Sequence, residues 1–191
     1  RLAATATRPV VLSDTQDNPG AGANSDTTGM LRAMLEAGAS GAIGNLFDPA
    51  AAQAAHEAGE GAVVELALGG HSGVPGDSPL RRAYTVEKLS DGVFTAPGPY
   101  YGGRVMEMGP SACLRIDDVR IAVTSAKAQM ADRAMFSSLG IIPEHEQILV
   151  VKSSNHFRAD FTPIAEEILV CQSPGPMAVD PATLPWRRLR R

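Results

Sequence analysis

The sequence is poor in cysteine, aromatic residues and long apolar runs, and each shortage excludes a class of protein. Its 191 residues hold two cysteines, Cys113 and Cys171. Two cysteines cannot build a disulfide framework, so we expect reduced thiols and an intracellular chain. No apolar run approaches the roughly 20 residues that span a bilayer, and no signal-peptide pattern is present. We therefore predict a cytoplasmic chain without a membrane partner.

A positive charge excess is also missing. The formal net charge is -4 and aromatic residues make up 5% of the chain, which argues against binding to nucleic acid. The basic end, with Arg187, Arg188, Arg190 and Arg191, is better explained as a solvated tail or a subunit contact.

Metal-ligand spacing is the last absence. None of the histidines, which are His56, His71, His145 and His156, forms a His-x-His or His-x-x-x-His pair. A zinc site needs three or four convergent ligands, so the sequence predicts no metal and no other cofactor bound by this chain itself.

What is present is the composition of a globular protein. Hydrophobic residues make up 44% and charged residues 20%, enough to build a core. With no repeat and no linker in sight, we predict one domain over residues 1–191. Because the chain opens with Arg1 rather than methionine, we expect it to be a piece of a longer protein.

The patterning predicts an α/β fold: a mixed sheet with parallel βαβ units at both ends of the chain and antiparallel hairpins in the middle. Asp26 and Asp48 are the expected N-caps of the first two long helices. The expected strands are 9–13, 41–45, 62–68, 83–89, 93–96, 112–116, 119–123, 147–152 and 168–171, with helices over 27–37, 49–59 and 131–139. The pairs 83–89 with 93–96 and 112–116 with 119–123 are the predicted hairpins.

Two polar segments follow predicted strands, where an open parallel sheet collects its ligands. They are residues 14–26 and 152–158, and neither is a phosphate-binding glycine motif. The candidates for substrate contact are Gln16, Asp17, Asn18, Ser154, Asn155, His156 and Arg158, with Asp14 as a further candidate. For Asp14 and Asp17 a second interpretation stays open, since such carboxylates also organise turns through local amides.

Several motifs, in order, resemble the C-terminal domain of the MlrC-like metallopeptidases, the microcystinase C family. The longest is Val151-Lys152-Ser153-Ser154-Asn155-His156-Phe157-Arg158-Ala159-Asp160-Phe161. The others are Asp14-Thr15-Gln16-Asp17-Asn18-Pro19-Gly20, Asp26-Thr27-Thr28, Gly69-Gly70, Gly76-Asp77-Ser78-Pro79-Leu80, Gln129 ahead of Asp132, Phe136 and Leu139-Gly140-Ile141, Pro174-Gly175-Pro176 and Leu184-Pro185-Trp186-Arg187. One departure follows the first motif, where Ala21, Ala23 and Asn24 interrupt an expected glycine-rich stretch.

The resemblance implies a two-domain zinc peptidase or amide hydrolase whose zinc lies in an N-terminal metal-binding domain. That domain and a peptide or amide substrate are the implied partners. This chain would complete the substrate cleft, with Asp14 as an accessory catalytic residue and Gln129 and His156 as leading substrate contacts. Alone, it would bind no zinc tightly and be inactive. Two alternatives stay open: a stand-alone small-molecule binding module, and a dimerisation domain that forms a homo-oligomer.

Overall fold

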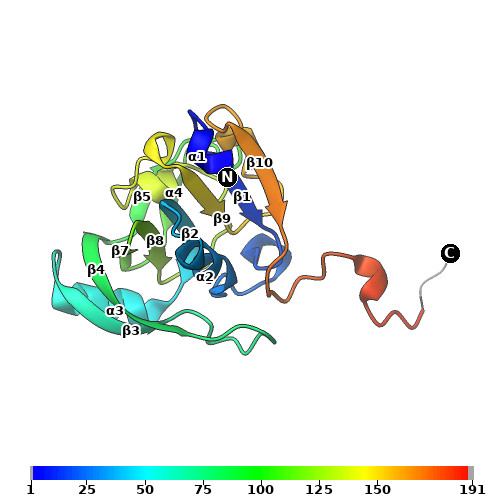
Figure 1. The fold of residues 1–191 in the computed structure, drawn as a ribbon, viewed down its shortest axis with the longest axis horizontal. Helices are drawn as coiled ribbons and strands as arrows, with labels where there is room; N and C mark the ends of the chain where they lie inside the picture. Colours follow the sequence, from blue (N-terminus) through cyan, green and yellow to red (C-terminus); the bar gives the residue numbers. More distant parts are fainter. Residues whose placement is uncertain (1, 189–191) are drawn as a thin grey trace.

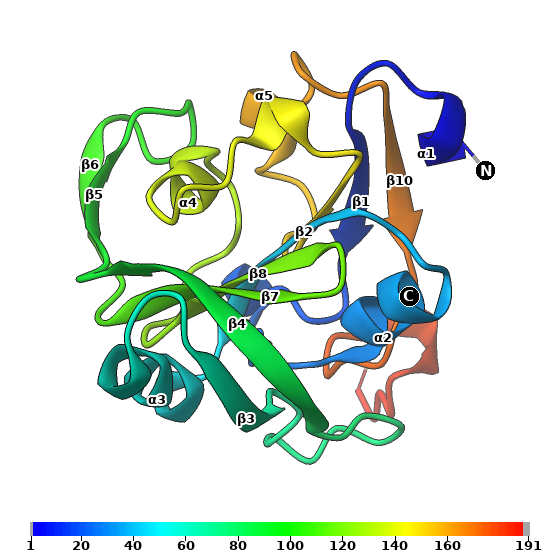
Figure 2. The same ribbon diagram turned by 60° about the vertical axis from the view of Figure 1, so that its left-hand side comes forward.

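A single eight-stranded sheet carries the fold, in the order β10-β1-β9-β2-β8-β7-β4-β3 (Figures 1 and 2). The computed structural model describes residues 2–188. The strands of this sheet are β1 (Val10–Asp14), β2 (Gly41–Phe47), β3 (Val63–Leu68), β4 (Leu80–Ser90), β7 (Ser111–Ile116), β8 (Val119–Thr124), β9 (Ile148–Val151) and β10 (Glu167–Cys171). A separate two-stranded sheet pairs β5 (Val93–Ala96) with β6 (Arg104–Glu107).

The large sheet has a parallel and an antiparallel part. Strands β10, β1, β9, β2 and β8 pair in parallel, and β7, β4 and β3 continue the sheet in antiparallel pairs. The predicted mixed α/β architecture is therefore confirmed. The hairpin of 112–116 with 119–123 is also confirmed, as β7 and β8, which turn through Asp117 at φ 49°.

Two predicted pairings are wrong. The third strand, expected to extend a parallel sheet, is β3, and it pairs antiparallel with β4 at the sheet edge. Residues 93–96 do not form a hairpin with β4 but pair with β6. β4 pairs with β3 over residues 80–85 and with β7 over residues 85–90, and after a bend at Asp91-Gly92 the chain enters the separate sheet of β5 and β6.

Helix boundaries follow local capping with one exception. Asp48 caps α3 (Pro49–Ala58), accepting a hydrogen bond from Ala51 N at 3.0 Å, as predicted. Asp26 does not cap α2 (Gly29–Glu36), whose N-cap is Thr28. The Asp26 carboxylate instead accepts hydrogen bonds from the amide and hydroxyl of Ser72, which ties two distant loops together.

The remaining helical segments are short. The helix predicted over 131–139 shrinks to α4 (Ala134–Ser137). Its expected first turn is lost because Asp132 bonds the amide of Gly98 as well as that of Ala134. The other helical segments are α1 (Leu2–Thr5), α5 (Arg158–Phe161), η1 (Pro19–Ala21), η2 (Pro143–His145) and η3 (Pro181–Thr183).

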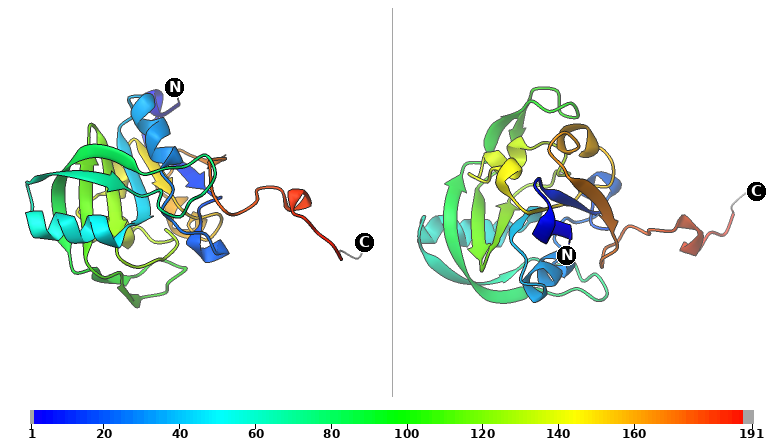
Figure 3. Two further views of the ribbon diagram at one scale, coloured as in Figure 1. Left: turned by 90° about the horizontal axis from the view of Figure 1, so that it is seen from below. Right: turned by 45° about the horizontal axis from the view of Figure 1, so that its top comes forward.

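The sheet separates two apolar cores. On one face, α2 and α3 bury side chains such as Leu31, Leu46 and Tyr84. On the other face, α4, α5 and the β5–β6 hairpin bury Phe136, Phe157 and Phe161. Figure 3 shows these layers from two further sides. Burial of both faces explains why the central strands read as continuous apolar runs.

The chain leaves the body after β10. Residues 178–188, which we call the C-terminal arm, project away from the sheet, as Figures 1 and 3 show. Within residues 2–188, no helix has the length and apolar character needed to cross a bilayer.

Candidate functional site

A buried cluster of charge lies where β1, β9 and β10 end. Lys152 directly follows β9, Asp14 closes β1, and Asp17 belongs to the loop after β1. The Lys152 Nζ atom lies 2.9 Å from Asp14 Oδ2 and 2.8 Å from Asp17 Oδ2. All three side chains have 0% exposure. We call Lys152, Asp14 and Asp17 the buried triad.

Every polar atom of the buried triad has a partner. The third proton of the Lys152 ammonium is donated to Thr27 Oγ1 at 3.1 Å. Asp14 Oδ1 accepts from Ser173 Oγ at 2.6 Å, just beyond β10. Asp17 accepts from the backbone amides of Ser25 and Thr27. These donors offset the excess negative charge of two carboxylates around one ammonium, which would otherwise be costly to bury.

The triad keeps Lys152 charged. Burial alone would lower the pKa of the Lys152 ammonium, but the charges and hydrogen bonds of Asp14 and Asp17 outweigh it and raise this pKa. The pKa of the nearby Cys171 thiol is also raised, first by burial and then by the negative charge of Asp14. The cluster therefore joins the ends of three parallel strands by charged hydrogen bonds.

Above the triad, the two polar segments are bonded to each other. Asn18 Nδ2 donates to Ser154 Oγ at 2.8 Å, while Asn18 Oδ1 accepts from the amide of Gly20. Gly20 lies so close to Gln129 that a Cβ at position 20 would come within 2.9 Å of the Gln129 side chain. Glycine at this position therefore makes room for Gln129.

Gln129 holds His156. Its Nε2 lies 3.1 Å from His156 Nδ1 and its Oε1 lies 3.2 Å from the same atom, so the amide orientation selects the imidazole tautomer. Ser153 Oγ donates to Gln129 Oε1 at 3.4 Å, which favours the amide as donor to Nδ1. In that arrangement His156 carries its proton on Nε2. Within residues 2–188, this Nε2 has no hydrogen-bond partner, so it is available to an incoming group.

Aromatic rings complete the surface. The Tyr100 ring stacks on His156 with centroids 4.3 Å apart and planes at 23°. Tyr101 packs edge-on against Tyr100 and donates its hydroxyl to the backbone oxygen of Gln129 at 2.9 Å. Burial, followed by Tyr100 and Asp132, raises the pKa of Tyr101 to about 12, so this donor stays protonated at neutral pH.

Two open depressions meet at Tyr100. One, of about 400 Å³, is lined by Pro99, Tyr100, Asn155, His156, Arg158 and Ala159. The other, of about 370 Å³, is lined by Pro19, Gly20, Tyr100, Tyr101, Met106, Lys127, Ala128 and Gln129. We call the two together the Tyr100 surface. Lys127 and Arg158 make its rim cationic, and Arg158 has its guanidinium over the Phe157 ring at 5.5 Å. Such a surface can bind carboxylate or carbonyl oxygens between aromatic walls.

The predicted site residues therefore fall into two layers. Gln129, Asn155, His156 and Arg158 line the Tyr100 surface. Asp14, Asp17 and Asn18 lie beneath it, each buried and engaged with protein groups. Ser154 links the two layers by accepting a hydrogen bond from Asn18. Gln16 belongs to neither layer, and its buried Oε1 has no hydrogen-bond partner within residues 2–188.

The sequence analysis did not select three residues that organise this region. Lys152 belongs to the longest family motif but is not among the predicted site residues, and Tyr100 and Tyr101 lie outside every motif. A lysine that contacts two aspartates at the ends of strands would indicate a buried ion-pair cluster. The contact could not be predicted from local sequence, because the two aspartates precede Lys152 by 138 and 135 residues. The aromatic pair carries no local pattern that would assign it to the site.

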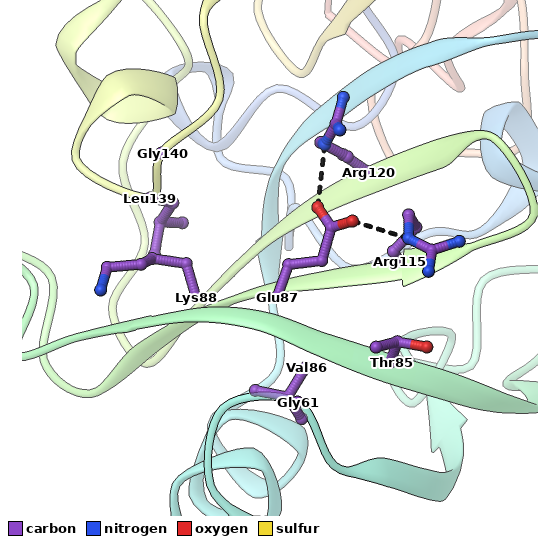
Figure 4. A pocket seen from close by; sticks show the side chains of 9 residues that line it. All are labelled: Gly61, Thr85, Val86, Glu87, Lys88, Arg115, Arg120, Leu139 and Gly140. Carbon is purple, nitrogen blue, oxygen red and sulfur yellow. Dashed lines mark hydrogen bonds and ion pairs between the residues drawn. The ribbon is translucent and has the colours of Figure 1, made fainter.

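A third depression, of about 510 Å³, lies on another part of the sheet (Figure 4). The β4–β7 pairing shifts register between Val86 and Lys88, and the bulged residue is Glu87. Its carboxylate lies between Arg115 and Arg120, at 2.6 and 2.8 Å. We call these three residues the surface triad. Arg120 also pairs with Glu146 at 3.1 Å, and Lys88, which lines the same depression, pairs with Glu60 at 2.8 Å. Each charged side chain lining this depression therefore already has an ion-pair partner.

Metal ligands do not converge in the described part of the chain. Within residues 2–188, no three His, Cys, Asp or Glu side chains are arranged to hold a metal ion. The donor groups of residues 2–188 therefore do not fit a zinc site.

Comparison with known proteins gives the family. The sequence model of the MlrC C-terminus family matches residues 12–188, and the chain belongs to this family. Microcystinase C from Sphingomonas sp. is 33% identical over 166 residues, which are 86% of this chain and 32% of that protein. A crystal structure of a "Putative metallopeptidase" from Mesorhizobium sp. BNC1 superposes with a TM-score of 0.86 at 30% identity.

The relatives are much longer than this chain. The chain is covered completely by the Mesorhizobium structure but spans 38% of it, and it spans about a third of the Sphingomonas enzyme. The resemblance inferred from the sequence motifs is thus confirmed at the level of the family.

Proposed function

We propose that this chain is the C-terminal domain of a zinc-dependent peptidase or amide hydrolase of the microcystinase C type. In this proposal it completes the substrate cleft beside an N-terminal metal-binding domain. The observation that carries the proposal is the Tyr100 surface, where His156 is oriented by Gln129, stacks on Tyr100 and has an Nε2 without a partner among residues 2–188. Family membership and the metallopeptidase relative support the reaction class.

The chain's own residues would bind and orient the substrate. His156 would donate its Nε2 proton to a substrate oxygen, or accept a proton in the other tautomer. Arg158 and Asn155 would hold a carboxylate or a peptide group, and the Tyr100 ring would pack against an apolar side chain. The chemistry that zinc supplies in such enzymes is activation of water and polarisation of the amide carbonyl.

In the same proposal, the buried triad has a positioning role. It holds the ends of β1 and β9 together, and the loop that follows Lys152 carries Ser154, Asn155 and His156. Asp14 has no exposed surface, so any influence on the reaction would pass through Lys152 or Ser173. The geometry favours this role for Asp14 over direct contact with the substrate.

The proposal is tested on the full-length protein that carries this chain. We expect it to hydrolyse linear peptides, to lose this activity on chelation and to regain it with zinc. Gln129→Ala should lower kcat/KM and alter its pH profile, because the tautomer of His156 is no longer selected. A full-length protein that hydrolyses no peptide or amide with any added divalent metal would refute the proposal.

A further inference from the structure

The C-terminal arm exposes apolar side chains that the body of the domain does not cover. Val179, Leu184 and Trp186 have relative exposures of 50%, 40% and 55%. Trp186 is also the only tryptophan of the chain. Within residues 2–188, every hydrogen bond of the arm joins it to itself, and the last backbone bond to the body is from Met177 N to Gln16 O.

The arm has a local structure of its own. Asp180 caps the short η3 turn by accepting from the amide of Ala182 at 2.9 Å. Trp186 Nε1 donates to Pro181 O at 2.6 Å, which fixes the indole against the turn. Pro181 and Pro185 restrict the backbone of the arm further. A segment that is preorganised in this way loses little entropy on docking, and tryptophan is enriched among the residues that contribute most to binding at interfaces.

The arm belongs to the family, because the family match extends to residue 188. The Mesorhizobium structure likewise covers the whole chain, and some 62% of that protein lies outside the region matched here, since the chain spans 38% of it. The relatives therefore contain a large mass of protein that could cover the arm. The arm also leaves the sheet at the carboxyl end of β10, the same edge at which β1 and β9 lead to the buried triad.

We propose that the C-terminal arm docks on the N-terminal domain of the same polypeptide and holds that domain over the Tyr100 surface. This inference rests on the proposed function, which supplies the N-terminal domain. The receiving surface would be an apolar pocket for Trp186 and Leu184, rimmed by acidic residues that face Arg187 and Arg188. Docking at this edge of the sheet would bring the two halves of the cleft together.

Hydrogen exchange of the full-length protein tests the arm. We expect the amides of Arg187 and Arg188, for which residues 2–188 supply no hydrogen-bond acceptor, to exchange at least about tenfold more slowly than their intrinsic rates allow, independent of protein concentration. Trp186→Ala should restore fast exchange in the arm. The matched control is Val105→Ala, which removes an apolar side chain of 63% exposure on β6 and should leave the arm protected.

Two outcomes would overturn the proposal. Arm amides that exchange at intrinsic rates in the wild-type protein would show that nothing covers the arm. Protection that depends on concentration, with a dimer in sedimentation that Trp186→Ala dissociates, would identify a second copy as the docking partner. Zinc content and peptide hydrolysis, measured on the same wild-type sample, separate failure of this inference from failure of the proposed function.

Discussion

The buried triad and the surface triad combine the same kinds of charge in different surroundings. Lys152 lies between two aspartates with no exposure, whereas Glu87 lies between two arginines that are 41% and 42% exposed. The ion-pair distances are similar, from 2.6 to 2.9 Å. Water screens the surface triad and can solvate any charge that loses its partner, but it cannot reach the buried one. Equal geometry therefore predicts very unequal consequences of substitution.

The largest effect is expected for Lys152→Met. This change leaves two carboxylates buried without their cation, which should lower the free energy of unfolding by about 3–5 kcal/mol. Urea denaturation of the variant and the wild type would measure it. A loss below about 1 kcal/mol would contradict the fully buried geometry, because only an exposed pair is so cheap to break.

Tyr84 shows the effect of burying a titratable group that is neutral in the folded protein. Its ring is fully buried and its hydroxyl donates to Leu80 O at 2.8 Å. Burial raises the pKa of Tyr84 to about 12. The folded state thus retains a proton that the unfolded chain loses near pH 10, so stability present below pH 10 should fall between pH 10 and 12, by up to about 2–3 kcal/mol. Tyr84→Phe should decline less over this range than the wild type. Parallel declines would rule out the contribution of Tyr84.

Asp14→Asn weakens the buried triad without removing its volume. Loss of one charged hydrogen bond should cost about 1–3 kcal/mol, while specific activity per folded molecule holds, since Asp14 acts through Lys152 and Ser173. The exposed Asp91→Asn serves as the matched control and should change neither property. Unchanged stability with a loss of activity of about 10²-fold would instead restore Asp14 as an accessory catalytic residue.

The smallest effect is expected for Glu87→Gln in the surface triad. Its two ion pairs are solvated, so the free energy of unfolding should fall by less than about 1 kcal/mol, and less again at high salt. Chemical denaturation at low and high salt measures both. A large loss that does not depend on salt would mean that the surface triad behaves like the buried one.

The sequence predicted the local features well. The strand positions other than that of β6, the hairpin of β7 with β8 and the Asp48 cap all depend on neighbouring residues and were confirmed. The mixed sheet followed from the same patterns. The predicted helix cap at Asp26 was wrong because its carboxylate binds Ser72, which lies 46 residues further along the chain. The pairing of β5 with β6 was missed because no strand was predicted over Arg104–Glu107, the partner of β5.

The candidate site was predictable only in part. The polar segments after β1 and β9 indicated where it would lie, because parallel strands share a carboxyl edge. Composition could not say which of their residues would be buried. That Asp14 and Asp17 face a lysine, while His156 faces a depression, depends on packing across more than 130 residues of sequence.

The proposed function depends most directly on the role of His156, and kcat/KM for peptide hydrolysis by the full-length protein tests it. We predict that His156→Ala lowers kcat/KM by about 10²-fold with an unchanged melting temperature. The matched control is His145→Ala, another exposed histidine, which lies before the opposite end of β9 and should retain full activity. Full activity of His156→Ala would contradict the assignment of the Tyr100 surface to the substrate cleft.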